Sequence, residues 1–237
     1  NIGVAMGSGT EVAKDAAQII VTDDNFASIV NGIEEGRYAY ANVRKVTLFL
    51  VTTGFAQIVV LLAAVLAYMP LPFVAVQLLW LNLVTNGIQD VALAFEAGEE
   101  GLMNLPPRRP TEGIFNRKMV EQVLVGGLTM AAVCIAGWWY LLRQDPNPDN
   151  SRGILLALLI AMQFYHALNS RSEYRSLFRV PLRNNPVLIY GMLLAFGVHL
   201  AATYTPFMSS LLSLARLTAL EWLALGAIAS VMVVVME

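Results

Sequence analysis

Six apolar segments dominate the chain, separated by short polar stretches. They are Val46–Met69, Val74–Phe95, Val120–Leu142, Ile154–Leu168, Val187–Tyr204 and Leu220–Met236. A membrane-spanning helix needs about 20 apolar residues, and five of the segments approach or reach that length. The fourth is short and is expected to extend into Asn169 and Ser170 within a bundle. Pro70 and Pro72 divide the first two segments, which predicts a helical hairpin. The pattern therefore predicts a mainly α, polytopic bundle of six transmembrane helices.

The second segment carries a polar stripe that an ordinary membrane helix would not carry. Val74–Phe95 is 22 residues long, yet it contains Asn82, Thr85, Asn86, Gln89 and Asp90. At about 100° per residue, these five fall within an arc of roughly 140° on one helix face. A carboxylate in a membrane helix is costly unless it faces protein, water or an ion. The stripe therefore indicates an ion site inside the bundle, whereas Glu96, just beyond it, is expected at the membrane interface.

The first 45 residues follow a different pattern. Ile2–Met6 and Gln18–Thr22 are predicted strands, and Thr10–Ala17 between them is a predicted helix with Ser8 or Thr10 as its cap. Asp23, Asp24 and Asn25 then cap a helix that begins at Phe26 and enters the first apolar segment without a proline or linker. This order predicts a partial α/β layer with parallel strands. Two strands cannot form a core of their own, so we expect the chain to be a piece of a larger protein.

Composition and charge support a membrane protein and suggest its orientation. Hydrophobic residues make up 57% of the 237 residues and charged residues only 14%, against about 25% charged in soluble domains. Twelve of the 15 basic residues lie in three places: before the first segment, between the second and third, and between the fourth and fifth. The positive-inside rule then predicts that both termini are cytoplasmic. The single cysteine, Cys134, lies in an apolar segment and excludes an internal disulfide.

Several motifs, in order along the whole chain, resemble the C-terminal part of P-type cation-transporting ATPases. I-G-V-A-M-G-S-G-T-E-V-A-K-D-A-A and D-D-N-F-A-S-I-V-N-G-I-E-E-G-R are similar to the end of the family's phosphorylation domain and the start of its fifth membrane helix. Q-L-L-W-L-N-L-V-T-N-G resembles the sixth-helix motif. The segments Pro106–Pro110 and Ala167–Glu173 resemble the loop after the sixth helix and the end of the eighth. The nearest group within the family contains the sarcoplasmic reticulum calcium pump.

The resemblance implies a domain division and a function. Residues 1–36 would be the C-terminal piece of a HAD-like cytoplasmic phosphorylation domain, and residues 37–237 would be membrane helices five to ten. The parent protein would use ATP and Mg²⁺, bound outside this chain, to drive a cation across the lipid bilayer. The chain has no D-K-T-G motif and no nucleotide-binding domain. We therefore expect no catalytic residue in it, and we expect its partners to be the cation, the bilayer and the other pump domains rather than nucleic acid.

The resemblance also implies which side chains line the ion pathway. The predicted ligands are Gln57, Asn82, Thr85, Asn86, Asp90 and Gln163. Gln57, Asn86 and Gln163 are amides where the calcium pump has carboxylates, and Gly54 stands where it has an asparagine. Asp90 adds a carboxylate where that pump has a small residue, and Gln89 replaces a helix-breaking proline. High-affinity divalent binding relies on negative charge in the cage. The set therefore favours a monovalent cation, a proton or a weakly bound divalent cation.

Other interpretations of these residues remain open at this stage. Gln57 and Gln163 could simply form hydrogen bonds between helices, and Asp90 could pair with a buried partner or water. His166 lies on the same helix face as Gln163, and either a pathway role or a packing role fits it. For the whole chain, the alternatives are a free-standing six-span transporter or channel, and a membrane scaffold that binds another subunit. The partial α/β start argues against the first and the polar stripe against the second.

Overall fold

The computed structural model describes residues 2–98, 101–107, 113–145, 147–172 and 175–237. It divides into two compact units, which we describe separately. The first consists of Asn1–Ala41 and Ala97–Pro110, and the second of Asn42–Glu96 and Thr111–Glu237. Two family-like motifs extend beyond the described residues, because Arg108, Arg109 and Pro110 of one loop and Glu173 of the other lie outside them.

The first unit begins with the predicted strand, helix and strand. β1 (Val4–Met6) pairs in parallel with β2 (Ile19–Val21), and α1 (Glu11–Ala16) connects them. The hydroxyl of Thr10 accepts a hydrogen bond from the backbone N–H of Ala13 and caps α1. Of the two predicted caps, Thr10 is therefore the correct one. The parallel pairing of two short strands through one helix confirms the predicted local α/β arrangement.

A turn rich in carboxylates connects β2 to the next helix. The hydroxyl of Ser28 and the backbone N–H of Asn25 donate to the Asp23 carboxylate, and these two bonds lower the pKa of that group. The backbone N–H of Ser8 donates to Asp24 at 2.9 Å, which lowers the pKa of Asp24. Asp24 thus joins this turn to the turn that follows β1. Both carboxylates satisfy backbone donors that neither strand nor helix can satisfy.

Helix α2 (Phe26–Leu66) is continuous over 41 residues, as the sequence predicted. No proline or glycine pair interrupts it, so each amide can bond four residues back. Within the first unit, Arg37 Nη1 donates to the carbonyls of Leu102 and Leu105 at 2.7 and 2.9 Å, at the short 3₁₀ helix η2 (Leu102–Asn104). The backbone of this loop is therefore tied to one side chain of α2.

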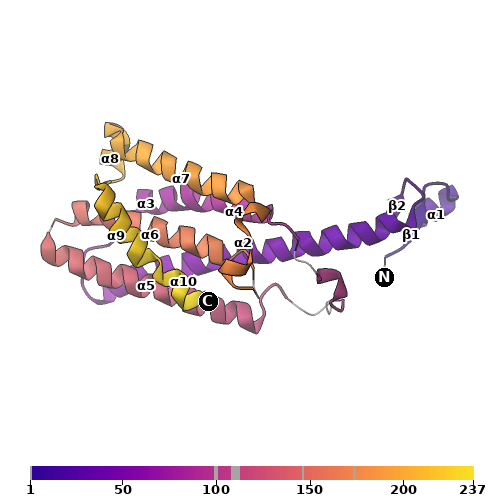
Figure 1. Ribbon diagram of the computed structural model, residues 1–237, viewed down its shortest axis with the longest axis horizontal. Helices are drawn as coiled ribbons and strands as arrows, with labels where there is room; N and C mark the ends of the chain where they lie inside the picture. Colours follow the sequence, from indigo (N-terminus) through magenta and orange to yellow (C-terminus); the bar gives the residue numbers. More distant parts are fainter. Residues whose placement is uncertain (1, 99–100, 108–112, 146, 173–174) are drawn as a thin grey trace. The chain divides into compact units, whose positions relative to one another are not determined.

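The second unit is a bundle of helices. It contains α5 (Arg117–Gln144), α6 (Pro148–Asn169), α7 (Pro186–Tyr204), α8 (Pro206–Leu211), α9 (Ala219–Ala229) and α10 (Val231–Met236), with short 3₁₀ helices η3 (Leu177–Arg179) and η4 (Leu182–Asn184) before α7. Figure 1 shows α5 beside α6, and α7 along α3 (Ala75–Trp80) and α4 (Gly87–Ala94). Within the described residues, five helical stretches are long and apolar enough to cross a membrane: α2, α5, α6, α7 and Ala219–Met236.

The second predicted span differs from a single regular helix. Its residues form three consecutive pieces: α3 (Ala75–Trp80), the π-helix η1 (Leu81–Asn86) and α4 (Gly87–Ala94). Each piece is too short on its own to cross a bilayer. The sequence predicted one helix here because periodicity alone cannot distinguish an i→i+4 from an i→i+5 bonding pattern.

Close helix packing depends on glycines of α5 and α6. A Cβ on Gly127 would lie 2.5 Å from Phe55 Cδ1, and one on Gly126 would lie 3.1 Å from Thr52 Cγ2. A Cβ on Gly153 would collide with the backbone of residues 213–215. These contacts bring α2 against α5 and fix α6 against the loop before α9 without intervening side chains. Small residues at helix contacts allow such a close approach of two membrane helices.

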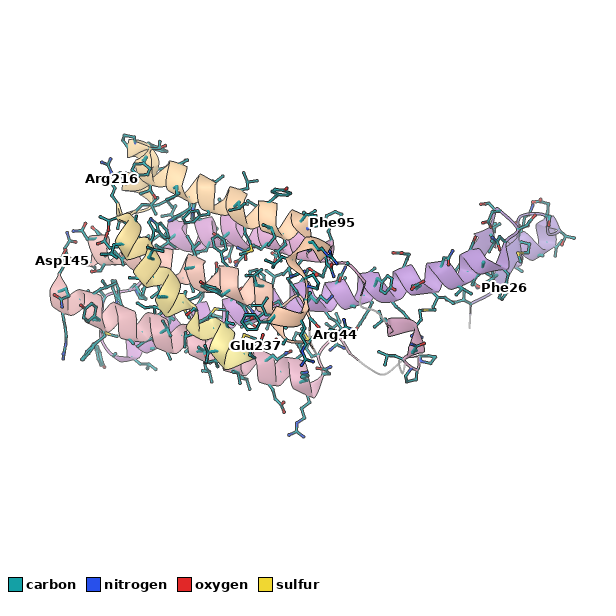
Figure 2. All side chains as sticks on the ribbon, viewed as in Figure 1. Phe26, Arg44, Phe95, Asp145, Arg216 and Glu237 are labelled. Carbon is teal, nitrogen blue, oxygen red and sulfur yellow. The ribbon has the colours of Figure 1, made fainter. Side chains whose placement is uncertain are left out.

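The residues labelled in Figure 2 identify the two ends of the bundle. Asp145 and Arg216 lie at one end, whereas Arg44, Phe95 and Glu237 lie toward the other. Arg152 also belongs to the first end, where its Nε donates to the carbonyl of Leu71 at 3.0 Å. The segment from α3 to α4 therefore runs between the two ends, in the same way as the longer helices beside it.

Candidate functional site

The centre of the candidate site is the π-helix η1. The backbone N–H of Gly87 bonds to the carbonyl of Asn82, five residues back, which closes the wider turn. Such π-turns are rare and occur frequently at functional sites, because the wider turn changes the direction of the side chains around it. The residues on either side of it, Trp80 and Gly87, both have α-helical backbone angles, with Gly87 at φ −57°. The π-turn lies directly before α4, which carries Gln89 and Asp90.

The polar stripe lies only partly inside the bundle. Thr85, Asn86 and Gln89 are fully buried, Asp90 is half-buried and Asn82 is exposed. Asn86 Nδ2 donates to Asn82 Oδ1 at 3.1 Å. This bond leaves the carbonyl oxygen of Asn86 available and holds its side chain in one direction. Direct contact between two predicted ligands is therefore present within the stripe itself.

Gln57 and Gln163 bring polar groups from two other helices. Gln57 lies on the buried face of α2, which also carries Thr53, Ala56 and Val60, and Gln163 is fully buried on α6. Helix α6 contacts η1 directly. The side chain of Gln163 forms no hydrogen bond to any residue within the described ranges. The alternative that Gln163 forms a hydrogen bond between helices is therefore not supported by any described partner, and its buried side-chain amide is unpaired.

Two apolar clusters flank these polar residues. The larger includes Ala56 of α2, Leu81 of η1 and Met162 of α6, and the smaller consists of Phe49, Ala92, Leu93, Ala167 and Leu188. Along η1 and α4, all the stripe residues lie between Leu81 and Ala92, and along α6, Gln163 and His166 lie between Met162 and Ala167. What we call the polar layer consists of the five residues of the polar stripe, Asn82, Thr85, Asn86, Gln89 and Asp90, together with Gln163 and His166. Gln57 adjoins it, next to Ala56.

The polar layer contains buried atoms that have no hydrogen-bond partner among the described residues. They are Asn86 Oδ1, Asp90 Oδ1, both ring nitrogens of His166 and both side-chain amide atoms of Gln89 and Gln163, and Nε2 of the adjoining Gln57 is unpaired as well. Native proteins satisfy about 90% or more of their buried polar groups, so a cluster of exceptions requires an explanation. An ion or water that binds these atoms would supply one. Amide and carboxylate oxygens are the ligands that hard cations prefer.

His166 lies within the polar layer but does not add a metal centre of the nitrogen or sulfur type. Its ring stacks on Phe49 with centroids 5.5 Å apart and an interplanar angle of 21°. No group of three or more His, Cys, Asp or Glu side chains capable of holding a metal occurs in the ranges that the structure describes. The donor set is therefore dominated by neutral oxygens with one carboxylate, Asp90.

A buried ion pair near the end of the polar segment was not predicted from the sequence. Arg171 Nη2 and Nε contact Glu96 Oε1 and Oε2 at 2.8 and 3.0 Å, and the two residues are 1% and 5% exposed. Asn185 Nδ2 donates to the same carboxylate at 2.9 Å and to the carbonyl of Ala92 at 2.8 Å. Glu96 is thus inside the protein rather than exposed to solvent. Three hydrogen bonds from two residues, Arg171 and Asn185, compensate the desolvation of this carboxylate.

The same network reaches α2 and the segment before α7. Asn42 Nδ2 donates to the carbonyls of Ala94 and Glu96 at 3.0 and 2.7 Å. Arg171 also donates to the carbonyls of Val180 and Pro181, at 3.2 and 2.8 Å. One arginine therefore joins the ends of α4 and α6 to the connection that precedes α7. The signal in the sequence was an acidic residue after the second span and a basic residue after the fourth, at the same predicted side of the membrane.

Comparison with known proteins identifies the chain. The apolar helices and their flanking loops define an integral membrane protein. The family described as "Cation transporting ATPase, C-terminus" matches residues 70–237. The chain belongs to this family, as the C-terminal membrane portion of a P-type pump, and this confirms the resemblance found in the sequence.

Three relatives show how much of such a pump the chain represents. It is 31% identical over 268 residues to the endoplasmic reticulum calcium ATPase srcA of Aspergillus fumigatus, covering 100% of this chain and 28% of the relative. It is 32% identical to a probable calcium-transporting ATPase of Trypanosoma brucei brucei, covering 92% and 24%. It is 35% identical to a calcium-transporting ATPase of Bacillus subtilis, covering 94% and 25%. The chain thus spans about a quarter of each relative's length.

Proposed function

We propose that this chain forms part of the ion pathway and the coupling helix of an ATP-driven cation pump. The observation that carries the proposal is the polar layer, in which unpaired amide and carboxylate atoms gather inside an apolar bundle. In the parent protein, ATP and Mg²⁺ would act on domains outside this chain. Those domains would supply phosphorylation chemistry, and residues 1–36 would complete the HAD-like phosphorylation domain. The chain alone would bind the cation without hydrolysing ATP.

The proposed topology has six crossings with both termini in the cytoplasm. Five long apolar helices support it, as does the course of α3, η1 and α4 between the two ends of the bundle. The basic residues before the first apolar segment and between segments two and three or four and five favour the cytoplasmic side for the end that carries Arg44. The exposed Asn82 would then face the helices that precede this chain in the pump.

Continuity of α2 supports a coupling role. A single helix carries residues of the first unit, up to Ala41, and the buried Gln57 of the second. A helix without a break transmits displacement along its axis, because each turn is bonded to the next. Movement in the phosphorylation domain would therefore change the position of Gln57 relative to η1.

The nature of the cation follows from the charge of the polar layer. Asp90 is its only carboxylate among the described residues, and Gln57, Asn86 and Gln163 are neutral. The proposed ion is a monovalent cation or proton, or a weakly bound divalent cation. The names of the relatives specify calcium, so weakly bound calcium is the divalent candidate that the similarity favours.

The proposal is tested with the full-length pump, purified and reconstituted in proteoliposomes. ATP hydrolysis and ion uptake are measured against a panel of Ca²⁺, Mn²⁺, Na⁺, K⁺ and protons. Cation-stimulated hydrolysis with ATP-dependent uptake supports the proposal. Uptake that runs down a gradient without ATP would support a free-standing channel or transporter instead, and folded protein with neither activity would contradict a pump. The isolated chain should form no acid-stable phosphoenzyme.

A further inference from the structure

The segment from α3 to α4 contains two fully buried glutamines, of which one side chain is hydrogen-bonded and the other is not. Gln77 in α3 donates from Nε2 to the carbonyl of Leu212 at 2.8 Å, and its Oε1 accepts from the backbone N–H of Val74 at 3.1 Å. Gln89 in α4 is equally buried, at 0% exposed, but neither of its amide atoms has a partner in the part of the chain that the structure describes. Because the two residues are both glutamines and are equally buried, their hydrogen bonding can be compared directly.

A structural role explains Gln77 and does not explain Gln89. Glutamines in membrane bundles usually stabilise helix packing through a bond to a neighbouring helix. Gln77 makes such a bond across to the segment after α8, whereas Gln89 makes none within the described ranges. A buried amide without partners destabilises the protein, since it loses its bonds to water and gains nothing in return. Its presence on a buried face therefore points to a ligand.

The position of Gln89 relates this ligand to the polar layer. It follows Thr85 and Asn86 by four and three residues on the buried side of the helix, just after the π-turn. The oxygen of Asn86 is likewise unpaired. One turn further on, Ala92 and Leu93 belong to the smaller apolar cluster, so Gln89 is the last buried polar side chain before that cluster.

We propose that Gln89 is a direct ligand of the transported cation through Oε1, an inference that rests on the proposed pump function. It would supply a neutral amide oxygen between the Asn86 oxygen and the apolar cluster. Hard cations accept such oxygens readily, and an uncharged donor adds affinity without adding to the charge of the cage. The residue lies outside the ligand set that the sequence predicts, because the resembling pump has a proline there.

The test replaces each glutamine with leucine in the full-length pump. Gln89→Leu should weaken the apparent affinity for the activating cation by about tenfold or more, the loss expected for one ligand bond to a charged group. It should not lower the thermal stability measured without the cation, because no bond within the protein is removed. Gln77→Leu is the matched control: its thermal stability should fall, and its cation affinity should stay within about twofold of the wild type.

A second variant and a binding measurement distinguish failure of the Gln89 proposal from failure of the proposed pump function. Gln89→Glu retains an oxygen ligand and adds charge, so it should retain cation binding and raise affinity for divalent over monovalent ions. Unchanged affinity in both Gln89 variants, with higher stability in Gln89→Leu, would show an idle buried amide and overturn the proposal. If the wild type lacks ATP-driven transport, the pump function fails. The Gln89 proposal is then decided by whether Na⁺ or Ca²⁺ raises the wild-type melting temperature more than that of Gln89→Leu.

Discussion

Arg171 and Glu96 form a bidentate ion pair, with N–O distances of 2.8 and 3.0 Å, almost entirely out of contact with solvent. They are 75 residues apart in the sequence. The guanidinium lies just after α6 and the carboxylate just after α4, so the pair fixes two helix ends that carry polar-layer residues. Its position beside Asn42 means that the same network also contacts α2.

We expect removal of one member of this pair to destabilise the bundle strongly. Arg171→Met leaves the Glu96 carboxylate buried with only Asn185, and such uncompensated charges cost about 3–5 kcal/mol of unfolding free energy. The double variant Arg171→Met, Glu96→Leu should cost less than the sum of the single changes, because no charge remains unpaired. Thermal and denaturant unfolding of the detergent-solubilised pump measures these differences.

The exposed pair of Arg117 and Glu121 provides the control for this prediction. Its atoms are 2.8 Å apart, but the side chains are 93% and 58% exposed. Arg117→Met should therefore change the unfolding free energy by about 0–1 kcal/mol. Equal effects for Arg171→Met and Arg117→Met would show that burial does not strengthen the first pair, contrary to our expectation.

Gly153 should be intolerant of even one added methyl group. A Cβ there would overlap the backbone at Ala215 and Ser213 and would lie 2.9 Å from the carbonyl carbon of Leu214. Backbone cannot move aside as a flexible side chain can, so Gly153→Ala should destabilise the bundle by about 3 kcal/mol, at the upper end of overpacking costs.

Gly54 is the matched glycine for this comparison. A Cβ at Gly54 meets nothing within 4 Å, although it also lies inside a long helix. Gly54→Ala should therefore be neutral or raise the unfolding free energy by up to about 1 kcal/mol through helix propensity. Thermal unfolding of both variants under one condition decides the matter. Little loss for Gly153→Ala would mean that the loop before α9 is less tightly packed than the structure indicates.

Interruption of the backbone hydrogen bonds of helix α2 should abolish its proposed coupling role. Tyr40→Pro removes a backbone donor and kinks the helix, at a cost of about 3 kcal/mol. In the full-length pump we expect ion-stimulated turnover to slow more than ATP affinity falls, because the proposed ATP site would lie in domains outside this chain. Tyr40→Ala is the control: it removes the same side chain but keeps the backbone bond. Normal turnover by a correctly folded Tyr40→Pro protein would refute the coupling role.

The sequence was sufficient for features that depend on local pattern, and insufficient for those that depend on pairing between distant segments. The runs of apolar residues predicted the long helices. The absence of a proline or linker between Phe26 and the first apolar segment predicted the continuity of α2. The π-turn at Leu81–Asn86 was missed, because its one-residue change in bonding leaves the apolar pattern almost unaltered. The burial of Glu96 was missed because its partner Arg171 comes from another helix, and a lone carboxylate near a membrane end is usually solvated.

In the candidate site too, the sequence predicted what depends on local pattern and missed what depends on packing between distant segments. Residue types and helical spacing identified the stripe from Asn82 to Asp90, but they could not show which of its members face inward. Asn82 in η1 is exposed, whereas Gln89 is fully buried in α4, which packs against α7. Hydrogen-bond satisfaction, which separates Gln77 from Gln89, is a property of three-dimensional packing and has no counterpart in composition.

Asp90 should determine whether the polar layer binds a cation at all. It is the only carboxylate among the described residues of the layer, and its buried oxygen has no partner there. Asp90→Asn keeps the size of the side chain and removes the charge, so we expect it to abolish cation-dependent changes in the phosphorylation level of the full-length pump while the protein remains folded. Measurement of phosphoenzyme against cation concentration tests this, with melting temperature as the check on folding.

Adding charge to the same layer should have the opposite effect on selectivity. Asn86→Asp places a second carboxylate one turn from Asp90, and paired carboxylates favour divalent over monovalent ions. The ratio of apparent affinities for Ca²⁺ and Na⁺ should therefore rise in this variant, provided that Asp90 is intact. Two results would contradict the charge argument: normal transport by Asp90→Asn, or submicromolar calcium binding by the wild type, since a cage with one carboxylate is too weakly charged for that affinity.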